Sequence, residues 1–106
     1  MEFRVVYYQG ASFDLKTKFE SGKAITSNDG LLIKGKREIQ IPTKSIQSVD
    51  MSLLNGLGRI IKIITTNNQT LFIMAVRLNI AGYFVIGNFF GTGKLYKFLT
   101  DIRLNA

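Results

Sequence analysis

The sequence contains no cysteine, no histidine and no tryptophan, and it has a single proline. Without cysteine the chain has no disulfide framework, no thiolate nucleophile and no cysteine ligands for zinc. Without histidine it has no serine–histidine triad and no imidazole to bind a metal. These absences close most ordinary enzyme chemistry, so we predict a non-enzymatic protein with no catalytic residues and no metal site.

Acidic residues are also few, and they offer no other route to catalysis. Of the 7 aspartates and glutamates, no two form a spaced pair on one predicted face that would suit acid–base or metal chemistry. Gly91–Lys94 resembles the end of a nucleotide-binding loop, but Asn88 stands where that loop needs glycine and Leu95 where it needs serine or threonine. We therefore interpret Gly91–Gly93 as a turn that leads into a helix, and we predict no cofactor.

Positive charge is plentiful by contrast. The chain has 14 lysines and arginines and a formal net charge of +7 in 106 residues, which favours anionic partners: lipid head groups, an acidic membrane surface, nucleic acid or an acidic protein. The alternative is a surplus that only aids solubility. The cations are scattered, and the one dense group is Lys34–Arg37. Because a dedicated DNA-binding protein concentrates its charge on one helix or arm, nucleic-acid binding by a small β-barrel is the weaker alternative.

One segment, Leu71–Phe90, is apolar enough to raise the question of a membrane span. It contains Arg77, and an arginine at the centre of a spanning helix costs about 2.5–3.5 kcal/mol. Arg77 and Asn79 fall on one side of an extended chain and Leu78 on the other, which is the period of a strand. We predict two buried strands joined near Arg77–Asn79 and no transmembrane segment.

The amino terminus bears on the compartment. It lacks the apolar core and the small-residue cleavage site of a signal peptide. We therefore predict a cytoplasmic protein, with the inner face of the membrane as the place of any peripheral association.

Turn signals divide the chain into short β-prone segments. Asn28-Asp29-Gly30, Asn55-Gly56 and Asn67-Asn68 each lie between apolar or β-branched runs, and these residue types tolerate the positive φ of tight hairpins. Pro42 ends a strand because it cannot donate to the ladder. The predicted strands are Phe3–Tyr8, Lys23–Thr26, Leu31–Lys34, Arg37–Ile41, Ser45–Leu54 with a bulge or a late start, Arg59–Thr66, Gln69–Val76 and Tyr83–Phe90, while Phe13–Phe19 fits a strand or a short helix.

The carboxyl-terminal segment changes to a helical period. The range Thr92–Leu104 predicts an amphipathic helix, with Thr92 as its amino-terminal cap. Its apolar stripe recurs at i, i+3, i+4 and i+7 and consists of Leu95, Phe98, Leu99 and Ile102. Such a stripe must be buried, and the open mouth of a curled sheet can receive it.

The strands and the helix together predict a mainly β fold: a bent antiparallel seven-stranded barrel or sandwich capped by one carboxyl-terminal helix, in one domain over residues 1–106. The hairpin before the last strand is apolar on both faces, with Ile61 and Ile63 on one face and Ile60 and Ile64 on the other. Both faces of such a hairpin are usually covered, either by the terminal segments or by another chain. The second option predicts self-association.

The order of these features resembles the bacterial pleckstrin-homology-like (PH-like) and GRAM-like domains over residues 19–104, with residues 1–18 as an extension or a first strand. The resemblance rests on Gly22–Thr26, Asp29–Ile33, Ile39–Pro42, Ile46–Val49, Ile60–Thr66, Thr70–Met74 and the helix Thr92–Leu104. It implies a bent seven-stranded barrel capped by the helix. It also implies a binding or scaffolding module that associates with a protein partner or with an anionic membrane.

Many PH domains hold phosphoinositides with basic residues on the first hairpin. The nearest matching cations here are Lys34, Lys36 and Arg37, with Lys16 and Lys18 upstream. The resemblance makes these five the candidate anion- or phosphate-binding residues, with Lys23 beside them. The alternative is a solvated strand face and turn with no ligand.

Overall fold

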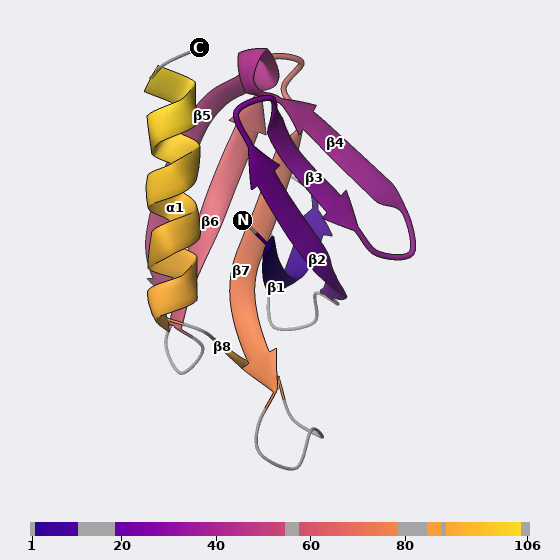
Figure 1. Cartoon of the computed structure of the whole chain (residues 1–106), viewed down its shortest axis with the longest axis vertical. Helices are drawn as coiled ribbons and strands as arrows, with labels where there is room; N and C mark the ends of the chain where they lie inside the picture. The colour runs from indigo at the N-terminus through magenta and orange to yellow at the C-terminus, as the bar shows by residue number, and fades with distance from the viewer. Residues whose placement is uncertain (1, 11–18, 55–57, 79–84, 88, 105–106) are drawn as a thin grey trace.

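The computed structural model describes residues 2–10, 19–54, 58–78, 85–87 and 89–104. Within them the chain forms eight strands, one short 3-10 helix and one long α-helix (Figure 1). The elements are β1 (Glu2–Gln9), β2 (Glu20–Ser27), β3 (Gly30–Lys34), β4 (Glu38–Pro42), η1 (Thr43–Ser45), β5 (Ile46–Leu54), β6 (Gly58–Thr65), β7 (Thr70–Leu78), β8 (Val85–Gly87) and α1 (Phe89–Leu104).

Seven of the strands form one continuous antiparallel sheet in the order β4-β3-β2-β1-β7-β6-β5, and β8 pairs with β7 beside this path. The sheet curls into a half-barrel, with α1 along β5, β6 and β7 and the hairpins of β2 to β4 on the other side (Figure 1). The mainly β fold predicted from the sequence, with one carboxyl-terminal helix, is confirmed. β4 and β5 are the two outer strands of the path, and η1 connects them directly.

The first predicted turn is a two-residue loop. Ser27 pairs with Gly30, so Asn28 and Asp29 alone make the reversal between β2 and β3. Gly30 has φ +139°, a value that side-chain-bearing residues rarely adopt. The Thr43 hydroxyl donates to the Asn28 carbonyl at 2.8 Å, so this turn is tied to η1.

The turn between β6 and β7 is also confirmed, with Asn68 at φ +64°. An asparagine tolerates this left-handed conformation better than most residues with a side chain. The predicted bulge is present too, because the pairing of β5 with β6 shifts register between Ile46 and Ser48. The predicted turn at Asn55-Gly56 lies outside the described residues.

The main core lies between the inner face of the curled sheet and α1. The predicted stripe of the helix is confirmed: Leu95, Leu99 and Ile102 are buried in this core, and Phe98 packs against it partly buried. The inward side chains of the sheet come from all seven strands of the path. They include Val5, Tyr7, Ala24, Leu31, Ile33, Ile41, Ile46, Val49, Ile61, Ile63, Leu71 and Ile73.

A second apolar cluster lies on the outer face of β6 and β7. It contains Ile60, Phe72, Met74 and Val76, all buried. Tyr8 stacks on Phe72 with ring centroids 6.5 Å apart. The two-sided apolar character of this hairpin is therefore real, and the outer cluster is buried within a single chain, although Ile64 stays partly exposed. The argument for a second copy is weakened, and self-association stays an untested prediction.

Two expectations about the last segment were wrong. The helix begins at Phe89, so Gly91–Gly93 is part of α1 and not a turn leading into it. Thr92 is not a cap: its hydroxyl accepts a hydrogen bond from the Ala75 N–H at 3.1 Å and donates to the Ala75 carbonyl at 3.4 Å. The pairing of β6 with β7 ends at Ile73. The Thr92 hydroxyl therefore satisfies the N–H and the carbonyl of Ala75, which have no partner on β6. This contact favours a helix that begins before Thr92.

Candidate functional site

The register of the sheet aligns three cations in one row across its outer face. Arg4 of β1 lies opposite Lys23 of β2, and Lys23 lies opposite Lys34 of β3. Neighbouring positions on these strands, among them Val5 and Ile33, are fully buried on the inner face. The three cationic side chains are therefore exposed on the opposite face, and we call them the basic row.

The basic row is electrostatically unfavourable for the chain alone. Residues directly opposite on antiparallel strands have their Cβ atoms about 4.5–5.5 Å apart, and like charges there are destabilising. Glu38 lies opposite Lys34 at one end of the row, and the exposed Glu2 lies two residues from Arg4 on the same face, so both supply partial compensation. Within the described residues, none of the three cations forms an ion pair. An external anion would relieve this repulsion.

The turn between β3 and β4 extends the row with further positive charge. Lys36 and Arg37 lie in this turn, directly after Lys34, and both are exposed. The Gly35 N–H donates to the Arg37 carbonyl at 3.2 Å, which closes the turn. Of the five predicted anion-binding residues, Lys34, Lys36 and Arg37 lie at this turn. The register places Lys23, already named beside them from the sequence, opposite Lys34, and it adds Arg4. Lys16 and Lys18 lie outside the described residues.

Arg4 was missed as a candidate by sequence reasoning. The pairing of Lys23 with Lys34 follows from the two-residue turn, since Ser27 opposite Gly30 fixes the register of the whole hairpin. The pairing of Arg4 with Lys23 has no such local signal, because a long connection separates β1 from β2.

A polar pair lies under the turn of Gly35, Lys36 and Arg37, which we call the basic turn. Tyr7 is 1% exposed and pairs with Glu20 across β1 and β2. A Cβ placed on Gly35 would collide with the Tyr7 hydroxyl, so the backbone of the turn rests directly on it. The Tyr7 hydroxyl and the Glu20 Oε2 atom are buried with no hydrogen-bond partner within the described residues. Burial raises the pKa of Tyr7, the adjacent Glu20 carboxylate adds to the rise and Arg37 opposes it.

The described residues hold no group of three or more aspartate or glutamate side chains that could bind a metal ion.

Among the described helices, none is long and apolar enough to cross a membrane. Arg77, the residue that argued against a membrane-spanning helix, belongs to β7 and pairs with Ile86 of β8. The first predicted strand of this segment is therefore confirmed, although β7 continues past Arg77 to Leu78. The second is shorter than predicted, because β8 covers only Val85–Gly87 and Phe89 and Phe90 belong to α1.

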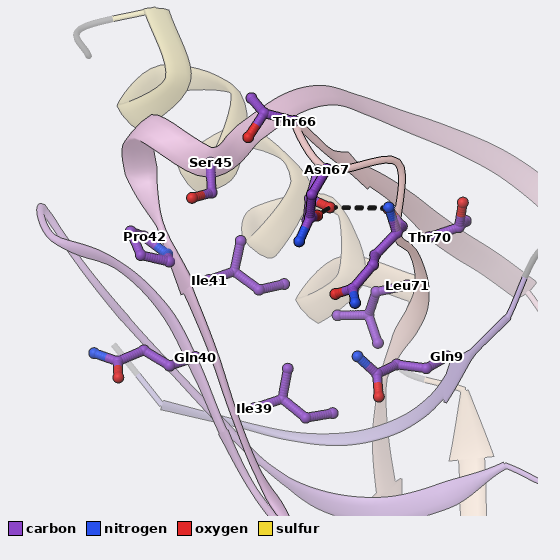
Figure 2. A pocket seen from close by; sticks show the side chains of 12 residues that line it. Gln9, Ile39, Gln40, Ile41, Pro42, Ser45, Thr66, Asn67, Thr70 and Leu71 are labelled. Carbon is purple, nitrogen blue, oxygen red and sulfur yellow. Dashed lines mark hydrogen bonds between the residues drawn. The ribbon is translucent and has the colours of Figure 1, made fainter.

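A cavity of about 170 Å³ lies between β4, η1 and the turn from β6 to β7 (Figure 2). Its carboxamide side chains are those of Gln9, Gln40, Asn67 and Gln69. Hydroxyl groups come from Ser45, Thr65, Thr66 and Thr70. Ile39, Ile41 and Leu71 supply an apolar surface beside Pro42. Every residue of the lining is uncharged.

Comparison with known proteins gives a likeness of fold and no function. Neither a family model nor a curated protein matches the chain. A crystal structure of the C-terminal domain of an unknown protein from Leishmania infantum is similar in fold, with a TM-score of 0.68 and 15% sequence identity. The match covers 98% of this chain and 82% of that one. At this identity the likeness concerns the fold alone.

Proposed function

We propose that the protein is a non-enzymatic binding module of PH-like or GRAM-like type that associates peripherally with anionic membrane surfaces. The basic row of Arg4, Lys23 and Lys34 is the observation that carries this proposal. The order of the strands and the terminal helix agree with what the resemblance implies. An anionic surface offsets a repulsion that the folded chain otherwise bears alone.

The magnitude of the attraction fits reversible association. A lysine or arginine near an anionic membrane contributes about 1 kcal/mol, so the row with Lys36 and Arg37 contributes roughly 5 kcal/mol. This energy falls as salt screens the charges over a Debye length of about 8–10 Å. The binding is therefore weak, salt-sensitive and dependent on the density of anionic lipid.

Neighbouring side chains favour a membrane over a nucleic acid. Ile25 and Leu32 lie opposite each other on the same outer face, next to Lys23 and Lys34, and both are partly exposed. Apolar side chains beside cations suit the interface of a bilayer. A single-stranded nucleic acid instead needs exposed aromatic platforms, but Tyr8, the aromatic residue of this face on β1, contacts Phe19 and Phe72.

The test compares two triple variants with the same loss of charge. In one, Arg4, Lys23 and Lys34 become glutamine; in the control, the exposed Lys44, Lys94 and Lys97 become glutamine. We expect the wild type and the control to co-sediment with phosphatidylcholine–phosphatidylserine vesicles at low salt, and the row variant to stay in the supernatant. Equal losses in both variants, or no binding by the wild type, would contradict the proposal. A gel shift of RNA or DNA that only the row variant loses would support the nucleic-acid alternative instead.

A further inference from the structure

We infer that the uncharged cavity beside β4 is a second binding site, for a neutral hydroxyl-bearing ring the size of one sugar residue. This site is separate from the basic row and does not depend on the proposed membrane function. It is formed by the end of β1, the edge strand β4 with η1, and the turn from β6 to β7. Residues far apart in the sequence therefore meet there, and Figure 2 shows their side chains around the cavity.

The lining sets the charge of the ligand. One residue in five of this chain is charged, yet no lysine, arginine, aspartate or glutamate lines the cavity. An ion that entered would lose water without gaining an opposite charge, which is costly. The site therefore favours a neutral molecule that exchanges hydrogen bonds with carboxamides and hydroxyls.

The volume sets the size of the ligand. A cavity of about 150 Å³ holds one benzene ring, and this cavity measures about 170 Å³. It is smaller than the roughly 300–1,000 Å³ of sites for drug-sized molecules. One six-membered ring fits, and a longer molecule would extend out of the cavity into solvent.

The cavity has an apolar side and a polar rim, as a pyranose ring has. Ile39 is partly exposed and offers an aliphatic surface to the C–H face of a ring, while the largely buried Ile41 and Leu71 contribute only their edges to the lining. Gln9 lies opposite Leu71 in the pairing of β1 with β7. Its carboxamide can donate to one ring hydroxyl and accept from the next, which suits a polyhydroxylated ligand.

Hydrogen bonds within the chain fix the polar rim of the cavity before a ligand binds. The buried Thr65 hydroxyl donates to Asn67 Oδ1 and accepts from the Gln69 N–H at 3.1 Å. The Thr66 N–H donates to the Ser45 carbonyl at 2.9 Å, which joins the turn to η1. With its oxygen engaged, Asn67 presents its amide nitrogen toward the cavity (Figure 2). A preformed donor of this kind binds without a large loss of conformational entropy.

The experiment is an NMR titration of the ¹⁵N-labelled chain with the neutral methyl glycosides of glucose, galactose and mannose, and with glucuronic acid as the charged analogue. We expect at least one neutral glycoside to shift the backbone amides of Asn67, Gln69 and Thr70 saturably. We expect glucuronic acid to shift them less. The row variant, which tests the membrane proposal, keeps this response, so the two proposals fail independently.

The decisive variant is Asn67→Asp, with Asn28→Asp as its matched control. Asn67→Asp keeps the oxygen that Thr65 needs but removes both amide donors and adds a charge. We expect it to weaken glycoside binding by about tenfold or more. Asn28→Asp makes the same chemical change at an exposed side chain that is not part of the lining, in the turn between β2 and β3, and retains wild-type affinity. Three results would overturn the inference: no shift with any neutral glycoside, a stronger response to glucuronic acid, or unchanged binding by Asn67→Asp.

Discussion

Two regions of one outer sheet surface differ in what the same backbone presents. On β6 and β7, the outward side chains of Ile60, Phe72, Met74 and Val76 are buried within the chain, while Lys62 and Ile64 beside them are partly exposed. On β1 to β3, the outward side chains at equivalent positions are Arg4, Lys23 and Lys34, and they are exposed. The strands alternate in the same way in both regions. The difference shows that one half of the outer surface contributes to stability, while the other half stays exposed and is the surface on which we propose that a partner binds.

The largest effect should come from the apolar half. Phe72→Ala removes a buried ring that packs with Tyr8, and large-to-small changes of this kind cost about 3–5 kcal/mol. We expect a corresponding loss in the free energy of unfolding measured by urea denaturation. The control is Ile25→Ala in the basic half, where the side chain is partly exposed and the loss should be much smaller. Equal losses at the two positions would remove the distinction between the two regions.

Substitutions under the basic turn should have an intermediate effect on the free energy of unfolding. Gly35→Ala forces a methyl group against the Tyr7 hydroxyl and should cost about 1–3 kcal/mol. Tyr7→Phe removes the hydroxyl that this methyl group would meet, and with it the interaction with the Glu20 carboxylate, so alone it should cost about 0.5–1.5 kcal/mol. Combined with Gly35→Ala, it should recover much of the lost stability. A double-mutant cycle of unfolding free energies with no coupling would show that the two groups do not meet.

A substitution in the basic row itself should have the smallest effect on the free energy of unfolding. It should stabilise the fold, where the other substitutions destabilise it. Lys23→Gln relieves two like-charge contacts, so it should stabilise the fold by about 0.2–1 kcal/mol at low salt. Lys44→Gln, an exposed control outside the row, should change little. Thermal unfolding at low and high salt checks this, because screening should abolish the gain. A destabilised Lys23→Gln protein would mean that the row is held by favourable contacts.

The sequence predicted local structure well because local signals control it. The turn residues Asn28 and Asp29 fix the pairing of β2 with β3, and the spacing of Leu95, Leu99 and Ile102 fixes the buried face of α1. The start of α1 could not be predicted in the same way. Thr92 looks like a cap in sequence, but its hydroxyl serves Ala75 of a distant strand.

The candidate sites depend on longer-range pairing, and they were predicted only in part. Lys34, Lys36 and Arg37 are close in sequence and could be recognised as a group. Arg4 joins them only through the register of β1 with β2. The cavity has no sequence signature, because curling of the sheet brings its three segments together.

The most direct test of the account is the ratio of vesicle partition coefficients for the two triple glutamine variants. Both lose three positive charges, but only one loses them from Arg4, Lys23 and Lys34. About 1 kcal/mol per cation predicts a partition coefficient that is roughly 100-fold lower for the row variant than for the control at low salt. Equal partition coefficients would show that net charge alone governs the attraction, and they would contradict the claim that the register of this sheet builds a binding surface.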